Sequence, residues 1–384
     1  MTTVRDRAGV HLDGFQEVRE ALRHDDLRQA LYSEAPFMQE ALISLHGEGH
    51  RRRRRAEQPL FARDALGLRE TNVVAIAEQT LRPYLEAGKG DLMRFGREVS
   101  VNLATSIAGI DRPAQTAAET ADLLDLILAF SESSTVANSR RDPEAVRSDA
   151  EAAWNRYLDR YLDPSIERRR RLLQSGAEPP GDIVTVMLQH GGLLSVTALR
   201  QEATLYMTAT VGTAPGVLVA TFDDLRKRWL EQPDLRTSEA RDVHFLQRAA
   251  WETIRLHPAN PQHLRRADRR VVLHTGTVIE KDQLVFLDII AANRDPTIFG
   301  PSADVFDPHR RMPAGVASWG LGFGAGIHVC MGQNLAGGTD SLLGMLAILL
   351  SILLPHQPVL DPDDPPRVAT TTTRRTWESY PIRF

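Results

Sequence analysis

Cysteine is the scarcest residue of this chain, because its 384 residues include a single one, Cys330. A lone thiol cannot form an intramolecular disulfide, which excludes a small secreted fold held by disulfides. The longest apolar stretch, residues 342–354, has the length of a buried core helix and is too short to span a bilayer. The first ten residues carry charges and no apolar core, unlike a secretory signal. We therefore expect a cytoplasmic protein with no membrane partner.

An excess of charge of one sign is also missing. The formal net charge is −4, which gives no indication of a nucleic-acid partner. Hydrophobic residues at 42% and charged residues at 25% are typical of a soluble globular protein. The arginine runs at residues 51–55 and 168–171 are expected to be solvated helix faces, with Arg54 as an exception.

Helical periodicity dominates the chain, and the strand-like runs are short and late. We expect helices at residues 13–31, 49–65, 73–86, 116–131, 149–162, 197–230, 240–256 and 331–354. Strands are expected at residues 271–273, 277–279 and 284–288. A loop is expected at residues 174–181. This pattern is typical of a mainly α fold with small β-sheets.

The cysteine lies in the sequence FGAGIHVCMG at residues 323–332, between glycines and before an apolar run. Glycines let the backbone approach a large flat ligand and turn N–H groups toward the sulfur. Such donors and a helix start behind Met331 are expected to lower the pKa of the Cys330 thiol. A thiolate in this setting suits a haem iron as axial ligand. A small buried hydrophobic residue is the alternative interpretation of a lone cysteine.

This segment resembles the ligand loop of the cytochrome P-450 superfamily of haem-thiolate monooxygenases. Every fixed position of that family's pattern is filled, by Phe323, Gly324, Gly326, His328, Cys330 and Gly332. The resemblance implies a single large domain over residues 1–384, with an N-terminus shortened relative to the family. It also implies a haem b whose iron is bound by Cys330, with Phe323, Gly324, His328 and Gly332 at the cofactor.

A second segment, WETIRLHP at residues 251–258, places a carboxylate and a guanidinium three residues apart on one helix face. Alone, this spacing is typical of an exposed ion pair. The resemblance implies that Glu252 and Arg255 join Arg310 in a buried triad that fixes the ligand loop. It assigns packing to residues 291–296. Loss of one triad member would leave a buried charge uncompensated.

The two propionates of a haem require cations. The resemblance implies four ligands for them, namely His50, Arg54, Arg265 and His328. His50 and Arg54 lie four residues apart, on one face of the expected helix. Arginine suits a carboxylate because its planar fork can bind both oxygens.

The expected helix at residues 197–230 departs from the family where oxygen is activated. Relatives typically carry an acid before a threonine there, and the pair relays protons. This chain retains the alcohol as Thr213, but Gly212 replaces the acid and Thr210 replaces an earlier glycine. Proton delivery is therefore expected to use Thr213, Thr210, ordered water or a polar group of the substrate.

Pro215 follows this departure closely. Proline lacks an N–H and clashes with the carbonyl four residues back, here that of Val211, and Gly212 weakens the same turn. We expect a kink or an opened groove at residues 211–215. The alternative is that the helix simply ends here.

Another departure from the family, LAGGT at residues 335–339, lacks the arginine and acid that relatives often carry behind the ligand loop.

The resemblance implies an enzyme that oxidises a small-molecule substrate, such as a secondary-metabolite intermediate, with O2 and two electrons. A ferredoxin and an NAD(P)H-dependent ferredoxin reductase are the expected partners, and the chain is expected to be a monomer. The missing acid raises intramolecular bond formation as an alternative to hydroxylation. A peroxide-using or redox-neutral enzyme and a non-catalytic haem-binding sensor or carrier remain open. Pocket walls are expected at Met207, Val211, Ala259, Asn260 and Thr371.

Overall fold

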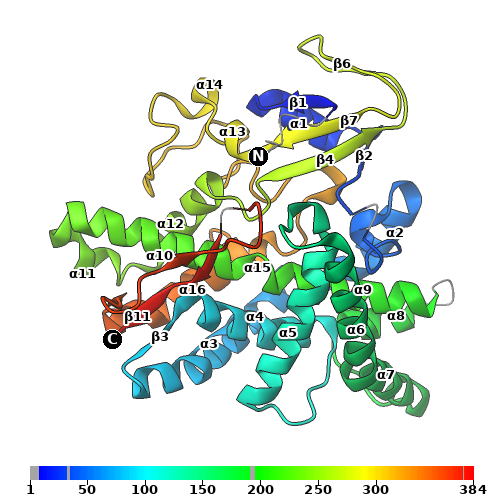
Figure 1. The fold of residues 1–384 in the computed structure, drawn as a ribbon, viewed down its shortest axis with the longest axis horizontal. Helices are drawn as coiled ribbons and strands as arrows, with labels where there is room; N and C mark the ends of the chain where they lie inside the picture. The colour runs from blue at the N-terminus through cyan, green and yellow to red at the C-terminus, as the bar shows by residue number, and fades with distance from the viewer. Residues whose placement is uncertain (1–7, 33–34, 191–194, 375) are drawn as a thin grey trace.

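The structure, a computed structural model, describes residues 8–32, 35–190, 195–374 and 376–384. A large helical body carries a smaller part rich in strands, which lies at the top of Figure 1. Helices of at least seven residues are α1 (Phe15–Arg23), α2 (Gly47–Glu57), α3 (Arg63–Glu86), α4 (Leu92–Ala108), α5 (Ala117–Ser134), α6 (Pro143–Tyr157), α7 (Asp163–Ser175), α8 (Ile183–Gln189), α9 (Val196–Val211), α10 (Ala214–Glu231), α12 (Val243–Leu256) and α16 (Gly344–Leu353). Shorter helices are α11 (Arg236–Glu239), α13 (Ile289–Ala292), α14 (Pro296–Phe299) and α15 (Gln333–Gly337).

The main sheet joins two strands near the N-terminus to two strands from the last third of the chain, in the order β1-β7-β4-β2. Its strands are β1 (Val10–Leu12), β2 (Leu27–Gln29), β4 (Gln262–Ala267) and β7 (Leu284–Asp288). Strand β1 is parallel to β7, whereas β4 is antiparallel to both of its neighbours. Small sheets use β3 (Lys89–Asp91), β5 (Val271–Val272), β6 (Val278–Ile279), β8 (Val359–Leu360), β9 (Arg367–Val368), β10 (Trp377–Ser379) and β11 (Pro381–Arg383).

The sequence prediction of a mainly α fold with small β-sheets is confirmed, but β1, β2 and β3 lie early in the chain, where no strand was expected. The three expected strands exist as β5, β6 and β7, and residues 176–182 form the expected loop between α7 and α8. The expected helix at residues 13–31 was too long, because α1 ends at Arg23 and β2 begins at Leu27. Pairing of β2 with β4 explains this end, since it draws the chain into the main sheet.

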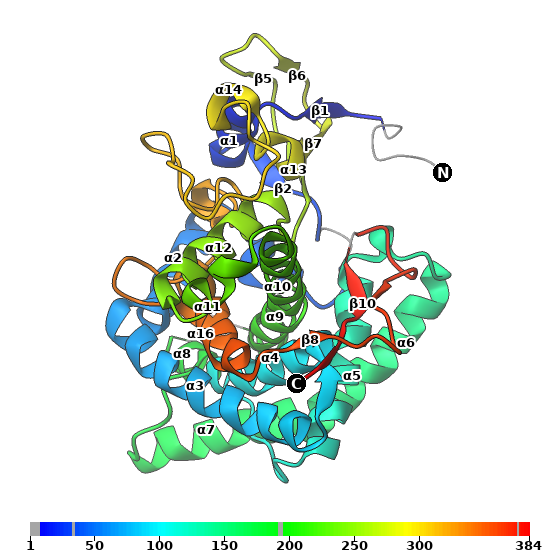
Figure 2. The ribbon, with the colours of Figure 1, turned by 90° about the vertical axis from the view of Figure 1, so that its left-hand side faces the viewer.

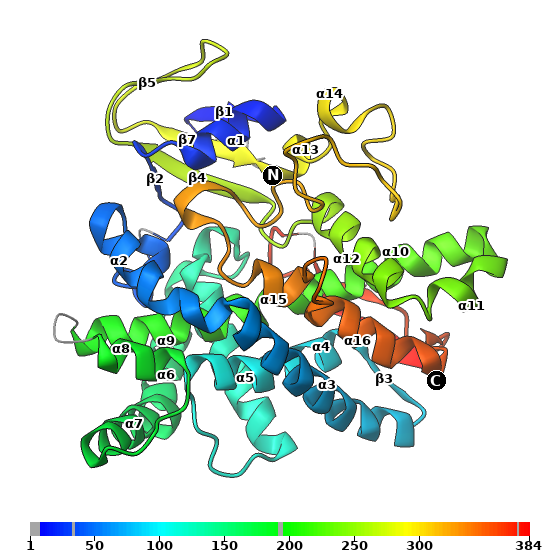
Figure 3. The same ribbon diagram turned by 180° about the vertical axis from the view of Figure 1, so that it is seen from behind.

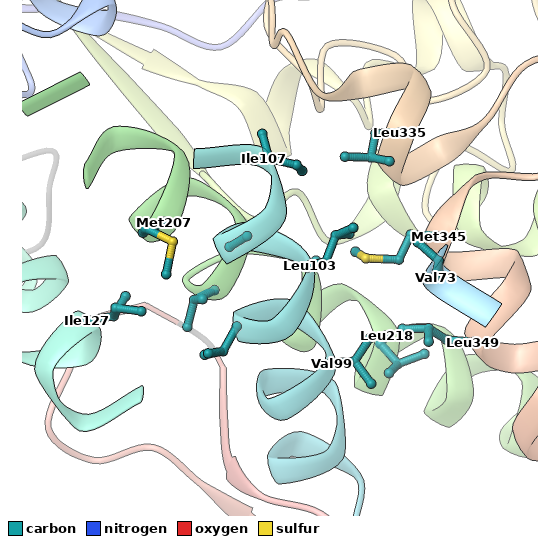
Figure 4. Close-up of a cluster of buried hydrophobic side chains, with 14 of the residues drawn as sticks. Val73, Val99, Leu103, Ile107, Ile127, Met207, Leu218, Leu335, Met345 and Leu349 are labelled. Carbon is teal, nitrogen blue, oxygen red and sulfur yellow. The ribbon is translucent and has the colours of Figure 1, made fainter. Parts of the chain in front are cut away.

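Helix α4 escaped the sequence analysis although it lies at the centre of the helical body. Its polar side chains Arg94, Glu98, Asn102 and Ser106 recur every four residues and form one face of the helix, a pattern that the sequence analysis overlooked. Its N-cap is Asp91, whose side chain accepts a hydrogen bond from the Arg94 N–H at 2.8 Å. Figure 4 shows Val99, Leu103 and Ile107 of α4 within the largest core cluster.

The predicted break near Pro215 is confirmed. Helix α9 ends at Val211, Thr213 has non-helical angles (φ −122°, ψ −55°), and α10 begins at Ala214. Pro215 then occupies the first turn of α10, where its missing N–H costs no hydrogen bond. The two helices follow one another through the centre of the molecule in Figure 2.

The segment Val196–Glu231, formed by α9 and α10, is long and apolar enough to cross a membrane by length and composition. The expectation that no stretch reaches this length was therefore wrong. However, 61% of its most apolar window is buried inside the protein, as in the core helix of a globular fold.

The helix expected at residues 331–354 is divided in two. Helix α15 ends at Gly337, because Gly338 adopts φ +78°, and α16 begins only at Gly344. The side-chain amide of Gln247 fills the turn and donates to backbone carbonyls, including that of Leu342 at 2.6 Å. A side chain at Gly338 would meet this amide nitrogen at 2.3 Å, so the turn requires glycine. Figure 3 shows α15 and α16 beside α2 and α3 on the rear face.

Candidate haem site

One cavity of about 320 Å³ lies between the cysteine loop and the break between α9 and α10. Its volume is at the lower end of the range typical of small-molecule and cofactor sites. Cys330 lies on its wall together with Thr210, Gly212 and Thr213. Among the described residues that line it, none is an aspartate or a glutamate, whereas three are arginines: Arg54, Arg265 and Arg374.

The cysteine loop is held in shape by its own backbone. The Cys330 N–H donates to the Phe323 carbonyl at 2.9 Å, and the Gly324 N–H donates to the Leu321 carbonyl at 2.8 Å. Gly324 and Gly326 have φ of +73° and +72°, a region that other residues rarely adopt. At Gly326 a side chain would also meet the Leu22 carbonyl of α1 at 2.5 Å. Phe323, His328 and Gly332 line the cavity, whereas Gly324 shapes the loop behind it.

The Cys330 side chain is exposed to the cavity, yet the surrounding protein removes most of its hydration. This burial raises the pKa of the Cys330 thiol, against the lowering effects of the Gly332 N–H and the Arg54 charge. The expectation of a thiol with a lowered pKa was therefore wrong for the protein alone, because desolvation outweighs both donors. A coordinated metal deprotonates a thiol outright, so the loop needs no lowered pKa to supply a thiolate to iron.

Glu252, Arg255 and Arg310 form one buried ion-paired group behind the loop. Both Glu252 carboxylate oxygens accept from Arg255 at 2.7 Å, and Oε1 also accepts from Arg310 Nε at 2.9 Å. Arg310 continues to the backbone carbonyls of Ser302 at 2.7 Å and Val305 at 2.8 Å. The guanidinium groups thereby attach the segment before the cysteine loop to α12.

Asn293 carries this attachment into the loop itself. Its Nδ2 donates to the Arg255 carbonyl at 2.9 Å, and its Oδ1 accepts from the Leu321 N–H at 2.7 Å. The residue is completely buried, and a side chain at Gly320 would meet its Oδ1 at 2.3 Å. Sequence analysis assigned residues 291–296 to packing alone and missed this connection, because an asparagine gives no local sign of a distant backbone partner.

The four residues expected to hold the propionates all line the same cavity. Arg54 donates only to the Ile327 carbonyl at 3.2 Å, and Arg265 only to the Leu264 carbonyl at 3.1 Å. Neither arginine has an acidic partner among the described residues. His50 has two buried ring nitrogens without a partner, and His328 has one, at Nε2. Unpartnered buried donors are costly, so this corner is built to receive an anion.

The electrostatics of this corner agree with an anionic ligand. Burial, followed by the Arg54 charge, lowers the pKa of His50 to about 4. Burial, followed by the Arg265 charge, lowers the pKa of His328 to about 2, and burial lowers that of Arg265 to about 10. Each shift shows that the protonated form is disfavoured, because the group is buried and, for the two histidines, because neighbouring positive charges repel it. Two carboxylates would supply the missing acceptors and charge.

On the opposite wall, the break places two hydroxyl groups toward the cavity. Thr213 Oγ1 donates to the Ala209 carbonyl at 2.6 Å, and Thr210 Oγ1 donates to the Tyr206 carbonyl at 2.9 Å. Gly212 lies between them without a side chain, and an added Cβ there would meet the Thr208 carbonyl at 2.9 Å.

The expected pocket walls divide into two groups. Ala259 and Asn260 line the cavity, as do Thr210, Gly212 and Thr213. Met207 and Val211 do not; they are buried in the core, where Figure 4 shows Met207 near Ile127. The reason is helical spacing, because residues four apart on α9 share the face turned away from the cavity. Thr371 is exposed outside the cavity, and its carbonyl accepts from the Arg140 N–H at 2.8 Å.

Comparison with known proteins gives consistent results. The Cytochrome P450 family model matches residues 226–374. Pulcherriminic acid synthase of Bacillus subtilis (strain 168) is 30% identical over 338 residues, which cover 84% of this chain and 78% of that protein. The chain belongs to the cytochrome P450 family. Cytochrome P450 4F5 of Rattus norvegicus is 26% identical, and the chain spans 45% of its length.

Solved P450 structures share the fold over nearly the whole chain. P450BioI, crystallised with an acyl carrier protein ligated by hexadec-9Z-enoic acid, has a TM-score of 0.78 at 18% identity and covers all of this chain and 94% of its own. CalO2 has a TM-score of 0.77 at 22% identity, covering 97% of this chain and 90% of its own. Members of the P450 family are oxidative enzymes with a cysteine-ligated haem, and Cys330 is the only cysteine that this P450 offers.

The residues present fit a haem. A cysteine lies at the cavity wall, unpartnered histidines and unpaired arginines lie beside it, and no described carboxylate competes for those cations. The cofactor corner thus has a sulfur for iron and cations for both propionates.

Proposed function

We propose that this P450 oxidises a small organic substrate of secondary metabolism, with electrons from a separate ferredoxin and its NAD(P)H-dependent reductase. The observation that carries the proposal is the common cavity, whose walls include Cys330 and, on another side, the hydroxyls of Thr210 and Thr213. A substrate in this cavity would lie between the haem and the helix break. We place the enzyme in the cytoplasm as a soluble monomer.

Each part of the chain has a separate task in this proposal. When bound, the haem-thiolate activates O2 for oxidation of the substrate. Cys330 would hold the iron, while His50, Arg54, Arg265 and His328 would bind the propionates. The Glu252–Arg255–Arg310 group and Asn293 hold the cysteine loop in position. Apolar side chains such as Val217 and Leu205 exclude bulk water from the cavity.

Proton delivery in this proposal runs through the break between α9 and α10. Gly212 carries no acid, so the proton reaches the cavity from ordered water at the break through Thr213 Oγ1, with Thr210 Oγ1 one turn earlier as the second hydroxyl. This cavity without an acid leaves intramolecular bond formation as an alternative to hydroxylation, because both reactions draw protons to release oxygen of O2 as water. The same feature favours a second candidate function, oxidation with peroxide, because peroxide brings its own protons.

A binding and turnover experiment tests the proposal. The purified holoenzyme is titrated with amide-bearing metabolites, indole-bearing metabolites and fatty acids while the spin state of the iron is followed. We expect at least one compound to shift the spin state, to accelerate NAD(P)H consumption with a surrogate ferredoxin and reductase, and to yield an oxidised product. Faster product formation with hydrogen peroxide alone would favour the second candidate. No spin shift and no reductant consumption with any compound would contradict both.

A further inference from the structure

Three large polar side chains on the cavity wall are not among the propionate ligands. They are Tyr32, just after β2, His263 in β4, and Arg374 in the segment before β10. All three are half-buried and line the cavity. None of their side chains forms a hydrogen bond or an ion pair with another described residue.

All three side chains line the same cavity, and the Arg374 charge acts on both of the others. Burial lowers the pKa of His263 to about 3, and the charges of Arg265 and then Arg374 add to this. Burial raises the pKa of the Tyr32 phenol, and the Arg374 charge opposes that change. The histidine is therefore neutral and the phenol protonated at neutral pH. The group carries one positive charge and presents several N–H and O–H donors, and its acceptors are the Tyr32 hydroxyl oxygen and the second nitrogen of the imidazole.

The backbone around this group is fixed. The Gln29 side chain accepts from the Tyr32 N–H at 3.1 Å and donates to the Ile43 carbonyl at 3.2 Å. His263 is held in register with Leu287 in the main sheet. The Arg374 N–H donates to Thr372 Oγ1 at 3.2 Å. The donors are thus presented from ordered segments, which reduces the entropy lost when a ligand binds.

Charge complementarity defines what this group can bind. The described cavity lining contains no carboxylate, and the two propionates of a haem account for Arg54 and Arg265. Among the described residues, the Arg374 guanidinium has no counter-ion, and the cavity that it lines is mainly apolar. A half-buried guanidinium forms its strongest hydrogen bonds with planar oxygen acceptors.

We propose that Tyr32, His263 and Arg374 form a substrate anchor for an acceptor oxygen group, either a carboxylate or an amide carbonyl. The anchor binds this polar end and directs the apolar remainder of the substrate across the cavity toward Cys330. This inference rests on the proposed function and deepens it, because it specifies the chemistry of the substrate. Selectivity follows from the unpaired donors, since a substrate without the acceptor leaves them unsatisfied.

The test uses probes whose binding does not depend on knowing the substrate. An alkyl chain carries an imidazole at one end, which ligates the haem iron and shifts its absorbance. Its other end is a carboxylate, a primary amide or a methyl group, in a series of increasing chain length. Dissociation constants are measured with the wild-type holoenzyme and with Arg374→Gln, Arg374→Lys and Tyr32→Phe. Arg367→Gln is the matched control, because Arg367 is exposed on the same segment and pairs with Asp364 outside the cavity.

At one or more chain lengths we expect the acid or the amide to bind about 10- to 100-fold more tightly than the methyl-terminated probe. Arg374→Gln should abolish most of this advantage without changing the affinity of the methyl probe or the haem content. Arg374→Lys should retain part of it, and Arg367→Gln all of it. An advantage for the acid alone identifies a carboxylate, and an equal advantage for the amide identifies a carbonyl.

Equal affinities of all three probes at every chain length would overturn the anchor. Loss of haem in Arg374→Gln would also overturn it, because this arginine would then belong to the cofactor site. Failure of the proposed function looks different. In that case the acid or the amide probe would still bind more tightly than the methyl probe, but no compound would accelerate NAD(P)H consumption or yield an oxidised product.

Discussion

The backbone N–H of Cys330 lies 2.9 Å from the carbonyl oxygen of Phe323, and this hydrogen bond closes the loop that presents the sulfur to the cavity. The loop is then fixed from behind by Asn293, whose side chain joins Leu321 to the Arg255 backbone. The position of the sulfur is therefore determined by a chain of contacts that ends in the Glu252–Arg255–Arg310 group.

Replacing Glu252 with glutamine should destabilise the protein strongly. Arg255 and Arg310 would lose their common carboxylate while their side chains remain buried, at 0% and 7% exposure. Breaking such a buried pair costs about 3–5 kcal/mol. Urea denaturation followed by tryptophan fluorescence, together with haem content, measures the loss. Glu167→Gln is the control, because Glu167 and Arg170 have the same i,i+3 spacing on an exposed face and should contribute less than about 1 kcal/mol. Equal midpoints for the two variants would contradict a structural role for the triad.

Replacing Arg54 with glutamine should weaken haem binding. Its guanidinium lines the cavity and has only the Ile327 carbonyl as acceptor, so its remaining donors are available to a propionate. Loss of a hydrogen bond to a charged group costs about 1.5–3 kcal/mol, which corresponds to about 10- to 100-fold faster haem transfer to apomyoglobin. Arg51→Gln should leave the transfer rate unchanged, because Arg51 is exposed and pairs with Glu48. A similar rate for both variants would remove Arg54 from the propionate site.

Replacing Thr213 with alanine should uncouple reductant consumption from product formation. Its hydroxyl is the one nearest the missing acid in sequence, and a positioned proton donor contributes about 10²–10⁴-fold to a rate. We expect product per NAD(P)H to fall about tenfold or more while peroxide release rises. Thr80→Ala tests the loss of a helical threonine elsewhere, since Thr80 Oγ1 also donates to the carbonyl four residues back. Unchanged coupling in Thr213→Ala would exclude this hydroxyl from proton delivery. Restoring an acid at Gly212 is less informative, because its Cβ would crowd the Thr208 carbonyl.

A buried pair of carboxylates, Glu57 of α2 and Glu202 of α9, should make stability depend on pH. Glu57 accepts from the Tyr206 hydroxyl at 2.6 Å, and Glu202 pairs with Arg53 and accepts from the Leu42 N–H at 2.9 Å. Burial, followed by the Glu202 charge, raises the pKa of Glu57 well above 4.5, and burial raises that of Glu202 to about 7. The folded protein thus retains a proton that the unfolded chain releases above about pH 4.5.

The contribution of this pair to stability is consequently greatest below pH 4.5 and declines as the pH rises through about 7. Glu57→Gln keeps an acceptor for Tyr206 and removes the ionisation. The free energy of unfolding of Glu57→Gln, measured by urea denaturation, should rise relative to that of the wild type between pH 5 and pH 8. We expect this relative gain to be about 1 kcal/mol or more. Titrating histidines elsewhere affect both proteins equally and cancel in the difference. A difference that stays constant over this pH range would contradict a shared buried proton.

Local motifs were the part of the site that the sequence predicted best. The cysteine loop and the Glu252–Arg255 pair are short segments whose residues meet through local geometry, and the break at Pro215 follows from the chemistry of one residue. The sequence could not predict what depends on distant packing. Burial of Cys330 raises its pKa, and Gln247 divides the helix expected at residues 331–354.

The anchor formed by Tyr32, His263 and Arg374 illustrates the same limit. Its residues come from three distant segments, and none belongs to a recognisable motif. The sequence did carry one indication that His263 lies at the cavity. His263 lies two residues before Arg265 in β4, and alternate residues of a strand point to the same face of the sheet. Met207 and Val211 were wrongly predicted to line the pocket. The sequence placed them on the correct helix, but it did not determine which face of α9 turns toward the cavity.

The most direct test of the central assignment is the spectrum of the reduced CO complex of Cys330→Ser. Cys330 is the only sulfur available as a thiolate, so the wild-type complex should show the red-shifted band of a haem-thiolate. In Cys330→Ser this band should be lost, even if the cavity and its cations retain the haem. Retention of the red-shifted band in Cys330→Ser would contradict the assignment of Cys330 as the iron ligand.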